Sequence, residues 1–114
     1  MKIREAKDVF DKVDYEADED WQISPQTLYQ CSVCGETIAF SLTDLDKHAF
    51  SKFTNLSAED SAQIEILINE SKVQGFNSFI DFYCPKCKKA IRVYYQSWAG
   101  GRYTNGHKLL FLVD

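Results

Sequence analysis

The chain has 114 residues, the usual length of one domain, and we expect residues 1–114 to form a single domain. Apolar residues make up 45% of it, enough for a hydrophobic core, but no apolar run approaches the roughly 18 residues of a membrane helix. No signal peptide is visible at the start of the sequence, so we expect a cytoplasmic protein that does not enter a membrane.

The formal net charge of −4 is unevenly distributed along the chain. Residues 1–83 hold 16 acidic and 7 basic side chains, whereas residues 84–114 hold 1 acidic and 6 basic ones. This asymmetry predicts two electrostatically different faces.

An acidic segment, residues 5–20, contains eight acids and two lysines. Its apolar residues include a set at the spacing of one helical face: Ala6, Val9, Phe10 and Val13. The pattern predicts a short N-terminal helix within residues 1–20. The open alternative is a solvated acidic tail that contributes only solubility.

A β-hairpin is predicted next. Residues 27–29 read as a short strand, and residues 37–41 alternate well enough to be its antiparallel return, with Ile38 and Phe40 on one face. The tip of this hairpin is the motif Cys31-Ser32-Val33-Cys34.

Residues 43–74 are predicted to form a helical insertion. Thr43 is an N-cap candidate for a first helix that includes Leu45 and His48. Ser57 begins a stronger capping signal and predicts a helix from about residue 58 to residue 73, with Gly75 as a stop.

The C-terminal part predicts a second hairpin and a final strand. Residues 79–83 and 90–97 form the hairpin around Cys84-Pro85-Lys86-Cys87, and residues 108–113 form the last strand. In the returning strand Ile91, Val93 and Tyr95 share one face, while Arg92, Tyr94 and Gln96 share the other. Asn105-Gly106 is predicted to be a turn with positive φ.

The four cysteines, Cys31, Cys34, Cys84 and Cys87, fall into two Cys-x-x-Cys pairs. A two-residue gap lets both sulfurs of a pair face one metal ion, so the two pairs predict a tetrahedral thiolate site, most simply for Zn²⁺. Four protein ligands leave no open coordination position, which predicts a structural role. Disulfides, thiol redox chemistry, unpaired cysteines and iron in the same cage are the alternatives.

The order strand, Cys-x-x-Cys turn, strand, found twice, resembles a zinc ribbon. Together with the predicted helical insertion between the two halves, the resemblance implies an α+β fold with an antiparallel sheet built on two zinc-knuckle hairpins. Gly35 fits the small residue that such knuckles place after their second cysteine, whereas Lys88 departs from that pattern. The 49 residues between Cys34 and Cys84 exceed the usual ribbon spacing of about 12–20 residues.

Catalysis has no support in the sequence. It contains no P-loop, dinucleotide fingerprint, GxSxG or HExxH motif. His48 and His107 are predicted to belong to a helix and to a turn or strand start, and not to replace a cysteine ligand. We therefore expect neither an enzyme nor a small-molecule substrate.

Two functions remain as expectations. The first is an acidic protein-binding module for a basic partner, such as an inhibitor or immunity protein that neutralises a nuclease toxin. Its candidate contact residues are Glu16, Asp18, Glu19, Asp20, Trp21, Trp98 and Tyr103. The second is nucleic-acid binding by basic and aromatic residues of the C-terminal part. Those residues are Lys86, Lys88, Lys89, Arg92, Tyr94, Trp98, Arg102, Tyr103 and Lys108.

Overall fold

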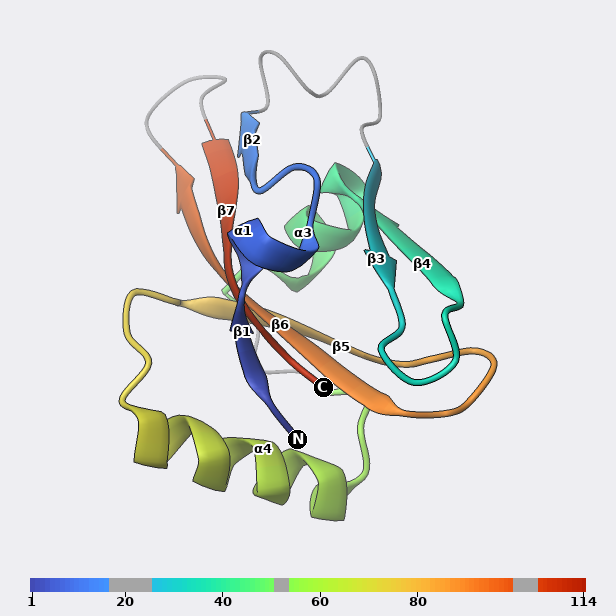
Figure 1. The fold of residues 1–114 in the computed structure, drawn as a ribbon. Coiled ribbons are helices and arrows are strands. Elements are labelled where there is room, and N and C mark those ends of the chain that lie inside the picture. Colours follow the sequence, from blue (N-terminus) through green and yellow to red (C-terminus); the bar gives the residue numbers. More distant parts are fainter. Residues whose placement is uncertain (17–25, 51–53, 100–104) are drawn as a thin grey trace.

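The computed structural model describes residues 1–16, 26–50, 54–99 and 105–114 (Figure 1). In chain order the elements are β1 (Ile3–Glu5), α1 (Ala6–Val9), β2 (Asp14–Glu16), β3 (Gln26–Gln30), β4 (Thr37–Ser41), α3 (Leu42–His48), α4 (Ala58–Ser71), β5 (Ser78–Tyr83), β6 (Ala90–Ala99) and β7 (Asn105–Val113). The fold is mixed α/β with antiparallel sheets.

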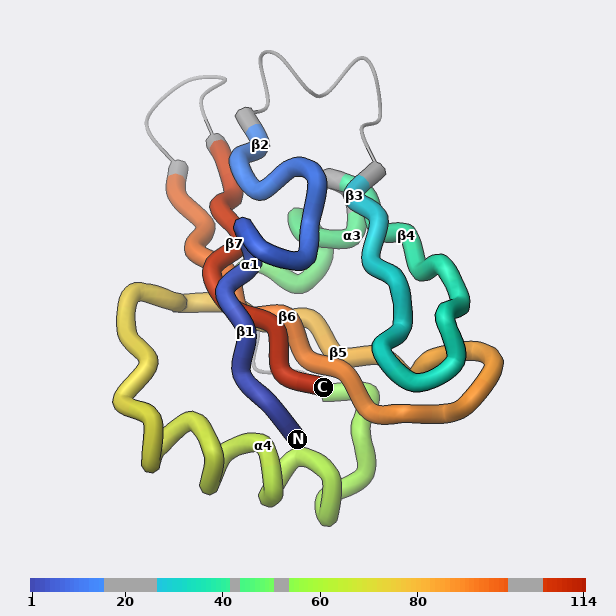
Figure 2. Tube along the Cα trace, viewed as in Figure 1, coloured from blue at the N-terminus to red at the C-terminus, as the bar shows by residue number. Residues whose placement is uncertain are grey.

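The larger sheet has the strand order β1-β7-β6-β5, and β2 also pairs with β7. The first and last strands are neighbours, so that Ile3 pairs with Val113 and the two chain ends lie side by side (Figure 2). The β3–β4 hairpin forms a separate two-stranded sheet. The two predicted hairpins exist, but they belong to different sheets and not to one continuous sheet.

Both faces of the larger sheet are covered. On one face α4 packs its buried Ile64 and Ile68, spaced one helical turn apart, against Tyr94 of β6. On the other face the β3–β4 hairpin, α1 and α3 pack against Ile91 and Val93. Because both faces are covered, every residue of β6 from 90 to 95 is buried, including Arg92 and Tyr94, which the nucleic-acid hypothesis requires to be exposed.

The long helix was predicted correctly. α4 spans Ala58–Ser71, and its N-cap Ser57 accepts a hydrogen bond at 3.1 Å from the backbone N–H of Asp60. It ends at Lys72, whose φ of 57° is left-handed, three residues before the predicted stop at Gly75.

Of three local predictions, two were wrong and one, the N-terminal helix, was correct only in part. α3 is capped by Ser41 and not by Thr43, because Ser41 forms a reciprocal capping box with Asp44. The N-terminal helix is only the four residues of α1; the chain is extended at its C-cap Phe10, and β1 and β2 on either side pair with β7.

The third concerns Asn105-Gly106, which lies inside β7 and is not a turn. Gly106 pairs with Trp98, and a Cβ at Gly106 would lie 2.6 Å from Cε2 of the Trp98 ring and 2.8 Å from the carbonyl oxygen of Tyr15. Glycine is therefore required here by the close approach of the tryptophan and the neighbouring backbone.

Candidate metal centre

The four cysteine sulfurs lie together where the tip of the β3–β4 hairpin meets the tip of the β5–β6 hairpin. Cys31 Sγ is 3.6 Å from Cys87 Sγ, and Cys34 Sγ is 3.5 Å from Cys84 Sγ. All four sulfurs lie within 4.8 Å of one another. Tetrahedral zinc with Zn–S bonds of about 2.3 Å places its sulfurs about 3.8 Å apart, so the arrangement fits a metal site. All four cysteines are free thiols, so the disulfide alternative is not what the structure shows.

The two Cys-x-x-Cys turns share one backbone geometry. In each, the N–H of the residue after the second cysteine donates to the carbonyl oxygen of the first: Gly35 to Cys31 and Lys88 to Cys84, both at 2.9 Å. Gly35 and Lys88 both have left-handed backbones, with φ of 76° and 64°. Lys88 therefore adopts the glycine-like conformation that its sequence position requires, at a cost of roughly 1–2 kcal/mol.

Backbone N–H groups help to set the charge on the sulfurs. The N–H of Cys87 is the main cause that lowers the pKa of Cys84 to about 6, and the N–H of Cys34 lowers the pKa of Cys31. At the second sulfur of the later turn, the N–H of Lys89 lowers the pKa of Cys87, but burial and neighbouring sulfurs outweigh it and raise the pKa to about 12. Four thiolates this close repel one another, and a divalent cation among them would offset that repulsion.

The first hairpin also reaches the larger sheet through polar contacts. The Tyr29 hydroxyl and the Arg4 guanidinium both donate to the carboxylate of Asp114, which is 3% exposed. The Thr27 hydroxyl donates to the carbonyl oxygen of Lys12 at 3.0 Å. Together with the cysteine cluster, these contacts hold the hairpin at three places along its length.

The predicted partner-binding residues are only partly described. Asp18, Glu19, Asp20, Trp21 and Tyr103 lie outside the described residues, and Glu16 is the last residue of β2. Trp98 lies in β6 and is 39% exposed.

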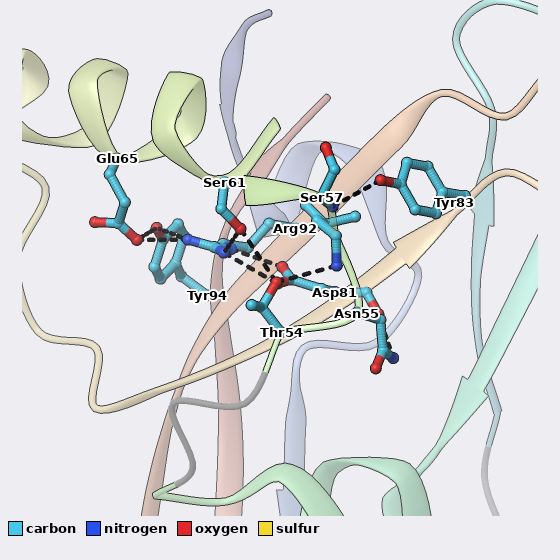
Figure 3. A network of polar contacts seen from close by, with 10 residues as sticks. Thr54, Asn55, Ser57, Ser61, Glu65, Asp81, Tyr83, Arg92 and Tyr94 are labelled. Atoms are coloured by element: carbon cyan, nitrogen blue, oxygen red, sulfur yellow. Dashed lines mark hydrogen bonds and ion pairs between the residues drawn. The ribbon is translucent and has the colours of Figure 1, made fainter. Parts of the chain in front are cut away.

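Arg92 and Tyr94 are buried beneath α4 and are not available as a binding face (Figure 3). The guanidinium donates to both carboxylate oxygens of Asp81, at 2.6 and 3.0 Å, and to Glu65 at 2.5 Å. It also donates to the Tyr94 and Ser61 hydroxyls and lies over the ring of Phe79. All five guanidinium N–H groups are thus used. Burial opposes the charge of Arg92, but the bonds to Asp81 and Tyr94 outweigh it and raise the arginine pKa. The alternating pattern of β6 did not predict this network, because a local pattern gives no information on whether a helix covers the face that carries Arg92 and Tyr94.

His107 was predicted at a turn or strand start but lies within β7, between Ser97 and Asp46. Its Nδ1 is 2.7 Å from Ser97 Oγ, and its Nε2 is 2.6 Å from an Asp46 carboxylate oxygen. The hydrogen bonds connect serine, histidine and aspartate in the same order as in a hydrolytic triad. However, Ser97 is only 3% exposed, and its Oγ also accepts a hydrogen bond from the hydroxyl of Ser78. This set therefore links α3 to β6 and β7, and gives a substrate no access to the hydroxyl. His48 lies in α3, as predicted.

Neither a scan of protein-family models nor searches of curated proteins and of solved structures found a match to this chain. Within the described residues, no helix has the length and apolar character needed to cross a membrane. The function is therefore inferred from the residues themselves.

Proposed function

We propose that Cys31, Cys34, Cys84 and Cys87 bind one structural Zn²⁺ and that the chain is a zinc-ribbon-like domain in which α3 and α4 are inserted between the two knuckles. The observation that supports this is the sulfur cluster, formed by two turns of the same backbone geometry. Because four thiolates fill a tetrahedral shell, the metal would stabilise the fold and would not activate water or substrate.

Metal analysis of tag-free protein tests this proposal. We expect one zinc per chain; iron in the same cage would instead be seen as visible absorption from thiolate-to-iron charge transfer. Protein with no bound metal, or with four thiols that react rapidly without a chelator, would contradict it.

We further propose that the domain is a non-catalytic protein-binding module for a basic partner. The supporting observation is α4, which carries four acids and no lysine or arginine in 14 residues. Glu59, Glu65 and Glu70 are exposed on it. A surface of one charge sign accelerates association with an oppositely charged partner and excludes like-charged ones.

An apolar spot lies among these carboxylates. Ile66 is 59% exposed and lines a hollow of about 220 Å³ together with Met1, Gln63, Leu67 and Glu70. An apolar centre with a charged rim is the usual composition of a protein interface. We infer that α4 contributes to the contact surface, and that the role is that of an inhibitor or immunity protein that neutralises a basic toxin such as a nuclease.

The structure does not favour the alternative that the basic and aromatic residues of the C-terminal part form one exposed nucleic-acid-binding face. Two of its residues, Arg92 and Tyr94, are buried beneath α4.

Charge reversal tests the protein-binding proposal. The partner would first be co-purified from the source cells at low salt and identified. We expect Glu59→Lys/Glu70→Lys to slow association about tenfold at low salt and to reduce its salt dependence, because steering is electrostatic. The control is Glu36→Lys, compared with the single variant Glu59→Lys, because each changes the net charge by the same amount and Glu36 lies outside both α4 and residues 5–20. Reversal of Glu16, Asp18, Glu19 and Asp20 tests the acidic segment in the same way.

Two results would contradict the proposal. One is that the wild type retains nucleic acid and no protein. The other is that neither the α4 reversal nor the reversal in the acidic segment slows association more than the control does.

A further inference from the structure

A basic hollow lies beside the cysteine cluster, on a protein whose overall charge is negative. It encloses about 410 Å³ between the start of β1, the first Cys-x-x-Cys turn and the end of the second. Lys2, Arg4 and Lys89 contribute cationic side chains to its wall, and Ser32 contributes a hydroxyl. These residues come from three distant parts of the sequence, so no local pattern predicts that they lie together.

The side-chain carboxylate of Asp114 also lines the hollow. Asp114 accepts hydrogen bonds from the Arg4 guanidinium, from the Tyr29 hydroxyl and, at 3.1 Å, from Ser32 Oγ. Its charge is therefore matched by Arg4, and the charges of Lys2 and Lys89 are left in excess. Lys89 Nζ is 3.5 Å from Ser32 Oγ, at the outer limit of a hydrogen bond, so this ammonium group makes at most a weak contact here.

We propose that this hollow binds a phosphate group. Ammonium, guanidinium and hydroxyl donors are those that proteins use to bind phosphate, and the excess of cations suits an anion of higher charge than one carboxylate. The volume lies in the range of small-molecule sites, which leaves room for a nucleotide as well as for free phosphate. A phosphate of a nucleic-acid backbone would present the same chemistry at the same donors.

Grouping like charges destabilises a protein unless a ligand or counter-charge offsets it. Lys2 is exposed and precedes β1, and Lys89 is only partly buried, so packing does not require either amine. The amines are therefore better explained by an anion than by the fold. The proposal does not depend on α4 binding a basic protein, since different residues form the two surfaces.

Titration of the metal-loaded, tag-free protein tests the proposal. The probes are inorganic phosphate, adenosine monophosphate, a ten-residue thymidine oligonucleotide and, as a carboxylate, acetate. We expect phosphate-bearing probes to bind in preference to acetate, and Lys2→Ala/Lys89→Ala to weaken their binding at least about tenfold. The matched control is Lys86→Ala/Lys108→Ala, which removes two exposed lysines that do not line the hollow.

The probes also distinguish the sources of phosphate. Tighter binding of the oligonucleotide, with a steep salt dependence, would identify a nucleic-acid backbone as the ligand. Tighter binding of the mononucleotide or of free phosphate would identify a small molecule. The single variant Lys2→Ala, which changes an exposed side chain, gives the same test if the double variant fails to fold.

The proposal is overturned if the wild type binds none of the phosphate probes at millimolar concentration. It is also overturned if acetate binds as well as phosphate, or if the control variant loses as much affinity as the hollow variant.

Discussion

Substitution of Cys84 by serine is expected to destabilise the fold strongly. Cys84 is fully buried and its Sγ lies 3.5 Å from Cys34 Sγ, so this pair is one of the two sulfur contacts between the hairpins through which they would share the proposed metal. A cross-link between residues 34 and 84 closes a loop of about 50 residues, which in the chain-entropy treatment contributes about 4 kcal/mol. For a domain of this length that is a loss of roughly 15 °C in Tm.

Metal content and thermal unfolding should be measured on the same samples. The control is Lys86→Ala, an exposed side chain in the same turn, whose Tm should stay within about 2 °C of the wild type, because surface substitutions rarely change stability by more than about 0.5 kcal/mol. A chelator should lower the Tm of the wild type toward that of Cys84→Ser and have little effect on the variant. If Cys84→Ser keeps its metal and its Tm, the cysteine cluster does not clamp the fold.

Three further outcomes are expected. Arg92→Ala should lower the free energy of unfolding, measured in urea, by about 3–5 kcal/mol, because it leaves the buried Asp81 carboxylate without its cation. The double variant Arg92→Met/Asp81→Asn should recover part of this loss. A loss below about 1 kcal/mol in Arg92→Ala would contradict the role of the network. Gly106→Ala should lower the free energy of unfolding by about 1–3 kcal/mol, because the new methyl group would collide with the Trp98 ring. The same substitution should cost less in a protein that already carries Trp98→Ala. Equal costs with and without Trp98 would exclude the collision. Burial is the main cause that raises the pKa values of Tyr29 and Tyr94 to about 12 from 10.0. The contribution of these two phenols to stability should therefore be fully present below pH 10 and be lost as the pH rises toward 12. A free energy of unfolding that does not change over this range, with tyrosinate absorbance appearing near pH 10, would contradict this.

Sequence patterns located the elements but not how they are layered. The boundaries of β4 and the start of α4 were predictable, because period-two alternation and a Ser-x-x-Asp cap are local signals. The sulfur cluster was predictable for the same reason, since the pair spacing restricts the geometry. The alternation in β6 is correct too, but the nucleic-acid hypothesis requires the face with Arg92 and Tyr94 to be exposed, and that face is buried. Whether α4 covers the second face depends on contacts between distant segments, and local patterns carry no information about those.

The same limit applies to Gly106 and to the basic hollow. Asn-Gly is a strong turn signal in isolation, yet the tryptophan on the neighbouring strand places Gly106 in β7. Lys2 and Lys89 are 87 positions apart and come together because β7 pairs antiparallel with both β1 and β6, which places the starts of β1 and β6 at the same end of the sheet. Charge counted along the chain assigned the positive character to residues 84–114 alone, whereas the fold adds Lys2 and Arg4 to it.

A two-stranded hairpin is at best marginally stable on its own, so β3–β4 depends on its attachments to the larger sheet. Those attachments are the cysteine cluster at its tip, the hydrogen bond between Tyr29 and Asp114, and aromatic packing such as that of Phe40 on Phe82 of β5. Ser32, which lines the hollow, lies in the turn that the metal would hold, and Lys89 closes the opposite turn through its carbonyl oxygen, which accepts from the N–H of Cys84 at 2.9 Å. The proposed metal centre and the hollow therefore share both turns. A phosphate bound in the hollow should favour the arrangement of the turns that binds the metal, and the bound metal should favour the arrangement that binds phosphate. Each ligand should thus increase the affinity for the other by the same factor.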